Sequence, residues 1–271
     1  MLTLLVLTDF SAAADHALHY AAALAAPGGA QLVLLHVRPS LLSPDALTAG
    51  SVAETEDEAH ALLRQRLQTL PAALPASAAV VSGELAAEVT AAVRQRGADL
   101  LVLGRPELGP VPDELVRTTS LSLLRHLPCP LLLVPQGSAA AVPPQRALLA
   151  VDEQPLPSVR STAGLAPLLG QAALTVAFVA DDAGASNPAR AFDNARQAGL
   201  LAGFGPAEAQ GYAHPEPAAG LAAAARQLQP DLLVLVARRR SFLGQLFHQS
   251  VTAAVVREAT QPVLVLPEHA D

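Results

Sequence analysis

The sequence predicts two consecutive α/β domains, each a parallel sheet with helices on both faces. Short runs of branched aliphatic residues recur along the chain, and longer Ala-rich segments with a helical period lie between them. Runs of that length without polar alternation are typical of parallel strands buried on both faces. The whole pattern then occurs a second time, which indicates a duplicated domain.

The first half contains five strand-like runs separated by helical segments. The expected strands are 2–8, 31–37, 78–82, 99–104 and 130–134. The expected helices are 11–26, 51–70, 84–97 and 118–127. Each helical segment is long enough for a right-handed crossover between parallel strands.

The second half repeats this order. Its expected strands are 146–151, 173–180, 207–213, 231–236 and 262–266. Asp9 and Asp152 end the two first strands and lie 143 residues apart, whereas Thr118 and Ser250 lie 132 apart. The spacing between equivalent residues of the two halves therefore falls from 143 to 132. This change indicates one deletion of 11 residues, between the second and fourth strands of the second half.

The same repeat sets the expected domain boundaries. Domain 1 covers residues 1–135 and domain 2 covers residues 146–271. The segment 136–145 is rich in proline and small residues, so we interpret it as the linker.

Composition excludes several classes of function. The 17 basic residues are all arginine, which excludes a Schiff-base lysine and a Walker-type phosphate lysine. The net charge of −7 disfavours binding to nucleic acid or to an anionic membrane, because both need clustered positive charge. The single cysteine, Cys129, excludes an internal disulfide and a cysteine-based zinc site. With no basic segment before the first apolar run, we expect a cytoplasmic protein.

Several stretches carry a family resemblance. They are VLTDFSAAADHALHYAAALAAPGGAQLVLLHV near the start, the turn at residues 82–84, the run GADLLVLG and the ending SLLRHLPCPLLLVP. Together they resemble a universal stress protein domain over residues 1–135. The runs ALLAVDE, PDLLVLV and HQSVTAAVVREATQPVLVLP extend the resemblance to residues 146–268. The chain is thus similar to a tandem, UspA-like universal stress protein.

This resemblance implies a particular sheet and a particular pairing. It implies two doubly wound, Rossmann-like domains, each with five parallel strands in the order 3-2-1-4-5. It also implies that the fifth strands pair, either across a homodimer or across tandem domains. Apolar edge strands invite aggregation when left bare, so we expect the two fifth strands of this chain to pair with each other as a pseudo-dimer.

The resemblance also implies a nucleotide site in the crevice where strand order reverses. Many relatives bind ATP there through Gly, two residues, Gly, nine residues, Gly and then Ser or Thr. The positions of domain 1 that match the family pattern are Asp9, Val37, Gly104 and Thr118. Glu107 and Arg117 stand where the second and third glycines are expected. A carboxylate about 4 Å from a phosphate charge is repelled by roughly 4 kcal/mol at an effective dielectric of 20.

Domain 2 departs further from the pattern. Asp152 and Ser250 are kept, but Ala180 replaces the valine of the second strand. The three glycine positions read Val236, Arg239 and Gln249. The triplet Arg238–Arg240 could clamp a phosphate or carboxylate in place of a glycine loop, or it could be a solvated loop.

Most other polar candidates have a structural alternative. Asp9 and Asp152 either bind a base or cap the following helix, and Thr118 and Ser250 can cap helices with or without a ligand. His248 near Ser250 lacks the strand-turn-helix elbow of a serine hydrolase. His16 and His19 share a helix but have no third metal ligand in view.

The sequence therefore predicts a protein without enzymatic activity or a bound metal. We expect it to act in the stress response through protein partners or a small anionic ligand. The alternative is an ATP- or AMP-binding protein, with or without slow ATPase activity, that uses the domain 1 crevice and ATP as its cofactor.

Overall fold

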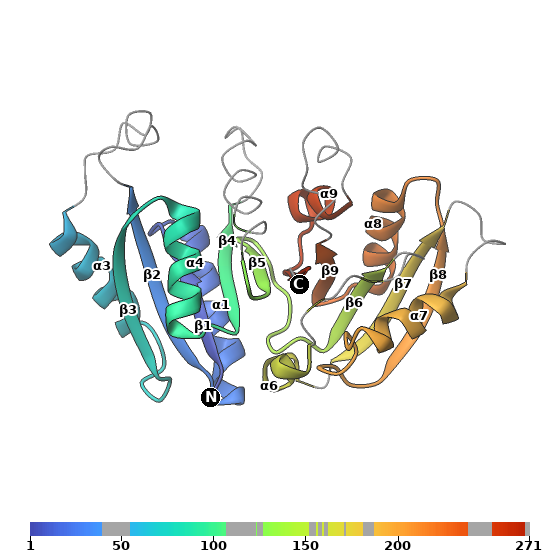
Figure 1. The fold of residues 1–271 in the computed structure, drawn as a ribbon, viewed down its shortest axis with the longest axis horizontal. Coiled ribbons are helices and arrows are strands. Elements are labelled where there is room, and N and C mark those ends of the chain that lie inside the picture. The colour runs from blue at the N-terminus through green and yellow to red at the C-terminus, as the bar shows by residue number, and fades with distance from the viewer. Residues whose placement is uncertain are drawn as a thin grey trace.

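The chain forms one continuous sheet covered by helices on both faces (Figure 1). The structure is a computed structural model. It describes residues 1–39, 55–106, 123, 127–151, 156, 159, 162–170, 172–180, 187–237 and 251–268.

The first half contributes five strands. They are β1 (Thr3–Leu7), β2 (Gln31–Pro39), β3 (Ala76–Gly83), β4 (Leu100–Arg105) and β5 (Leu131–Pro135). Its described helices are α1 (Ala12–Gly28), α3 (Glu56–Gln68) and α4 (Leu85–Arg96). Helix α3 begins later than expected because Thr55 and Glu58 form a capping box that defines its start.

The second half follows the same plan. Its strands are β6 (Arg146–Val151), β7 (Ala173–Ala180), β8 (Ala207–Ala213), β9 (Leu232–Ala237) and β10 (Val263–Pro267). Its helices are the 3-10 helix η1 (Thr162–Leu165), α6 (Ala166–Leu169), α7 (Pro188–Gln197), α8 (Pro217–Leu228) and α9 (Val251–Glu258).

The strand order confirms the expected fold class. It runs β3-β2-β1-β4-β5-β10-β9-β6-β7-β8, which is 3-2-1-4-5 in each half. The two fifth strands pair antiparallel at the centre, with Val263 opposite Leu133 and Val265 opposite Leu131. The expected pairing of the fifth strands within one chain is therefore confirmed, and neither of these apolar edges is bare.

Two layers of core pack against the two faces of the sheet. In β1, Leu4 and Val6 belong to the cluster beneath α1, whereas Leu5 and Leu7 belong to the cluster beneath α4. Burial on both faces explains why inner strands such as β1, β5 and β10 read as unbroken aliphatic runs. Each cluster contains residues from both halves, so the core is continuous across the β5–β10 pair.

In each half, an aspartate just before the fourth strand forms hydrogen bonds with the start of the first strand. Asp99 accepts a hydrogen bond from the backbone N–H of Thr3 at 3.0 Å, and Asp231 accepts one from that of Arg146 at 2.9 Å. The backbone N–H of each aspartate donates in return to the carbonyl of the same partner. These matched contacts explain why Asp99 and Asp231 are kept at equivalent positions of the repeat.

Candidate functional site

Strand order reverses between β1 and β4, which are direct neighbours in the sheet. Helix α1 follows β1 onto one face, and α4, which leads into β4, packs on the other. In open α/β sheets, ligands bind outside the carboxyl ends of the strands at such a switch point. The segments that follow Leu7 and Leu103 are therefore the first place to look for a site.

Asp9 lies just beyond the end of β1, and its side chain is exposed. Its Oδ1 accepts a hydrogen bond from the backbone N–H of Ser11 at 3.0 Å. The cap of α1 is Ser11 itself, whose Oγ accepts from the N–H of Ala14 at 3.2 Å. The alternative in which Asp9 caps the helix is therefore wrong, because Asp9 instead closes the tight turn before the cap.

Phe10, between Asp9 and Ser11, has a left-handed backbone with φ of 64°. Arg66 of α3 donates to the Phe10 carbonyl at 2.9 Å, and its guanidinium carbon lies 4.7 Å from the centre of the Phe10 ring. Arg66 also forms an ion pair with Asp15 of α1 at 2.6 Å. A left-handed non-glycine residue is unfavourable by itself, so these contacts hold the turn that carries Asp9.

The end of β2 lies beside this turn. His36 is buried, its Nδ1 lies 2.8 Å from the Thr8 carbonyl, and its ring centre lies 4.3 Å from that of Phe10. Val37 follows it and is half-buried. The register of the two strands therefore places Asp9, just beyond β1, beside Val37, near the end of β2, as the family pattern implies.

Gly104 has a packing role that the sequence did not reveal. A Cβ at this position would lie 2.3 Å from the carbonyl oxygen of Ala13 and 2.8 Å from the nitrogen of Ala14. The first turn of α1 therefore rests directly on the backbone of β4. Only glycine allows this approach, so the presence of Gly104 needs no phosphate to explain it.

Domain 2 is built differently at the equivalent place. Val236 occupies the Gly104 position, so a helix cannot rest on the strand in the same way. Val159 corresponds to His16 of α1, but it forms an antiparallel bridge with Glu268 just beyond β10. Among the described residues the first helix of domain 2 starts only at Thr162.

Several predicted site residues lie outside the described residues. They are Thr118, Asp152, Arg239 and Ser250, together with Glu107, Arg117 and Gln249 at the altered glycine positions. Ala180 is described and ends β7, the position equivalent to Val37. The structure thus brings together Asp9, Val37 and Gly104 and does not test the others.

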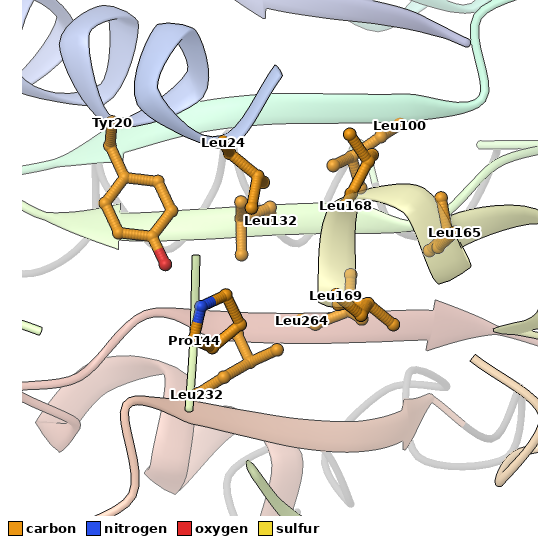
Figure 2. Close-up of a pocket in the computed structure, with 10 residues that line it drawn as sticks. All are labelled: Tyr20, Leu24, Leu100, Leu132, Pro144, Leu165, Leu168, Leu169, Leu232 and Leu264. Carbon is orange, nitrogen blue, oxygen red and sulfur yellow. The ribbon is translucent and has the colours of Figure 1, made fainter. Parts of the chain in front are cut away.

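A small cavity lies between the two halves, beneath α1 and α6 (Figure 2). Its lining is apolar except for the hydroxyl of Tyr20, which points toward Pro144 (Figure 2). The lining residues are Tyr20, Leu24, Leu100, Leu132, Pro144, Leu165, Leu168, Leu169, Leu232 and Leu264. Burial, and then the negative charge of Asp231, raise the pKa of Tyr20 well above its usual range. The space has room for about one water molecule at most, so this is a feature of the core and not a ligand pocket.

Three further observations concern the described part of the chain. No three histidine, cysteine, aspartate or glutamate side chains in it are grouped to hold a metal ion. Cys129 is buried, as expected of a structural thiol. None of the helices among these residues has both the length and the apolar character needed to cross a membrane.

The fold and its strand-order reversal define a doubly wound α/β protein of the class that binds ligands at strand carboxyl ends. The sequence model of the universal stress protein family matches residues 1–135 and again residues 146–267. The chain therefore belongs to the universal stress protein family and carries two copies of its domain.

Solved structures share this architecture over nearly the whole chain. A universal stress protein from Archaeoglobus fulgidus has a TM-score of 0.72 at 16% identity, covering 98% of both chains. A protein described as functionally unknown from Pseudomonas aeruginosa has a TM-score of 0.58 at 18% identity, covering 98% of this chain and 92% of that one. At these identities the likeness concerns the fold alone. A comparison with curated proteins found no match.

Proposed function

We propose that this protein is a non-catalytic tandem universal stress protein whose nucleotide sites are degraded. It acts in the stress response by binding protein partners or a small anionic ligand. The observation that carries this proposal is the packing of the Ala13–Ala14 peptide on Gly104. Helix packing accounts for the one motif glycine that remains, while Glu107 and Arg117 replace the other two.

The second half supports the same proposal. Val236 replaces the glycine, and Val159, the equivalent of His16 in α1, pairs with Glu268 in a β-bridge. A helix N-terminus offers phosphate its free N–H groups, and Pro155 and Pro157, at the positions of the first turn of α1, have no backbone N–H. Domain 2 then serves mainly as the built-in partner that covers β5. We place the protein in the cytoplasm, since a chain with a single cysteine has no internal disulfide of the kind that secreted domains use.

The alternative proposal is that domain 1 binds ATP or AMP, with or without slow hydrolysis. The exposed Asp9 beside Val37 favours it, because a turn held by Arg66 would present the carboxylate in a fixed place. This proposal requires the loop after Gly104 to accept phosphate despite Glu107.

A nucleotide-release experiment separates the two proposals. The purified protein is denatured and the supernatant is assayed for adenine nucleotide. The degraded-site proposal predicts no stoichiometric release, and release of about one nucleotide per chain would favour the ATP-binding alternative.

A pair of substitutions then tests whether repulsion from the Glu107 carboxylate is what weakens ATP binding. Glu107→Gly removes both the charge and the bulk, whereas the matched control Glu107→Gln removes the charge alone. If repulsion limits binding, both variants should bind ATP with magnesium at least about tenfold more tightly than the parent, a change of about 1.4 kcal/mol. An unchanged affinity in both variants would show that Glu107 is not the obstacle.

A further inference from the structure

Arg105 ends β4 in domain 1 and reaches into domain 2. The residue is only 7% exposed. Its guanidinium donates to the carbonyl of Arg257 at 2.5 Å and also to the carbonyl of Ala259. The last carbonyls of a helix have no partner within the helix, so Arg105 caps the C-terminal end of α9 from the other domain.

The charge of Arg105 suits this position. The C-terminal end of a helix carries a partial negative charge, which favours a cation there. Burial lowers the pKa of Arg105, and the carbonyls at the end of α9 offset part of the cost of burying its charge. A planar guanidinium with several donors can meet two carbonyls at once, which lysine does less well.

The contact is one-sided. With the offset of 132 residues that relates β4 to β9, the equivalent of Arg105 is Ala237. An alanine side chain has no donor, so the second contact that the repeat would allow cannot form. The pseudo-dimer is therefore asymmetric at this point.

The contact lies next to the segments that carry the nucleotide motif in both domains. Arg105 follows Gly104 directly and precedes the segment that carries the altered motif of domain 1. Helix α9 starts at Val251, directly after Ser250 of domain 2, and its eight residues span roughly 12 Å. One short rigid helix thus separates Arg105 from the end of the corresponding segment in domain 2.

We propose that Arg105 is a coupling residue that links the carboxyl end of β4 in domain 1 to helix α9 in domain 2. Loosening α9 loosens the end of β4, and because coupling free energies are reciprocal, the converse also holds. The use of this link in signalling rests on the proposed function, but the link itself requires no ligand.

A second physical route connects the same elements and must be distinguished. Strand β10 follows α9 and pairs with β5, which pairs with β4. Coupling through this ladder would persist without the Arg105 side chain, whereas coupling through Arg105 would not.

The test is a double-mutant cycle measured by amide hydrogen exchange without added ligand. Ala254→Gly loosens α9 from within, and the helix propensity of glycine predicts about fivefold faster exchange in α9. We expect at least about threefold faster exchange at the end of β4 in this variant. In an Arg105→Gln background, Ala254→Gly should leave β4 exchange unchanged.

Two controls keep the cycle interpretable. Arg146→Gln removes a largely exposed guanidinium and should preserve the β4 response to Ala254→Gly. If Arg105→Gln does not fold, Arg105→Met keeps the aliphatic stem and should give the same result. A β4 response that is absent in the parent background, or that persists without Arg105, would overturn the proposal. Because no ligand is present, neither result depends on whether the protein binds ATP.

Discussion

At the scale of single residues, Gly104 shows how one position can be interpreted in two ways. The family pattern assigns it to a phosphate loop, whereas the structure places the α1 backbone against it. Its equivalent in domain 2 is Val236, and there Val159, the equivalent of His16 in α1, forms a β-bridge with Glu268. A motif comparison alone does not reveal that the glycine position is tied to the packing of a helix.

Gly104→Ala tests this packing role. The added Cβ would lie 2.3 Å from the carbonyl oxygen of Ala13, which is backbone and cannot rotate away. We expect a loss of about 1–3 kcal/mol in the free energy of unfolding, measured with urea. The matched control is Gly164→Ala, where a Cβ meets nothing within 4 Å and should change stability little. Similar effects of the two substitutions would contradict the account.

The raised pKa of Tyr20 predicts that the folded protein loses stability at alkaline pH. Its pKa in the folded protein is raised above the ordinary value of 10.0, mainly by burial, so folding favours the neutral phenol. The stabilisation is complete below pH 10 and is lost as pH rises through the folded pKa. No lysine titrates in the same range, because the chain has none.

Tyr20→Phe should therefore flatten the loss of unfolding free energy above pH 10, relative to the parent protein. Tyr212→Phe is the comparison: partial burial and then Glu208 also raise the pKa of Tyr212, but its side chain is less buried than that of Tyr20, so the flattening should be smaller. Denaturant unfolding at a series of pH values measures the effect. Parallel alkaline decline of parent and Tyr20→Phe would show that Tyr20 is not responsible.

At the scale of elements, the strands were predictable and the starts of the first helices were only partly so. Burial on both faces makes an inner parallel strand an aliphatic run, and all ten expected strands lie within two residues of their observed bounds. The outer strands β3 and β8 are less buried and less apolar. Within the part of the chain that the structure describes, the first helical segment of domain 2 starts at Thr162, whereas α1 starts at Ala12. Pro155 and Pro157 occupy the sequence positions equivalent to the first turn of α1, which is a signal that the two segments differ.

The cap of α1 is an element-scale feature with a measurable effect. Ser11→Ala removes the acceptor for the N–H of Ala14 and should destabilise the protein by about 1 kcal/mol. Ser77→Ala, at an exposed position of β3, is the control and should change stability by less than about 0.5 kcal/mol. Urea unfolding compares the two, and equal effects would argue against a capping role.

At the scale of the whole molecule, the two halves share one sheet and one pair of core layers. Sequence pattern and family resemblance were enough to predict the order 3-2-1-4-5 and the pairing of the fifth strands. The Arg105 contact was not predictable, because Arg257 and Ala259 lie more than 150 residues away in the chain and carbonyl acceptors leave no sequence signature. The bridge between Val159 and Glu268 was not predictable either, because these residues lie 109 apart in the chain and an isolated bridge leaves no sequence pattern.

A shared core predicts cooperative unfolding. Because both hydrophobic clusters contain residues of both halves, neither half can unfold without exposing apolar surface of the other. Differential scanning calorimetry should show a single transition whose calorimetric and van't Hoff enthalpies agree. Two resolved transitions would mean that the halves unfold independently.

The degraded nucleotide site is the central claim, and calorimetric titration of the purified full chain with ATP and magnesium tests it most directly. The account predicts no saturable binding in the micromolar range, because Glu107 and Arg117 replace two motif glycines and Gly104 is taken up by helix packing. Saturable binding at low micromolar ATP, with a stoichiometry near one per chain, would contradict it and identify domain 1 as a working nucleotide site.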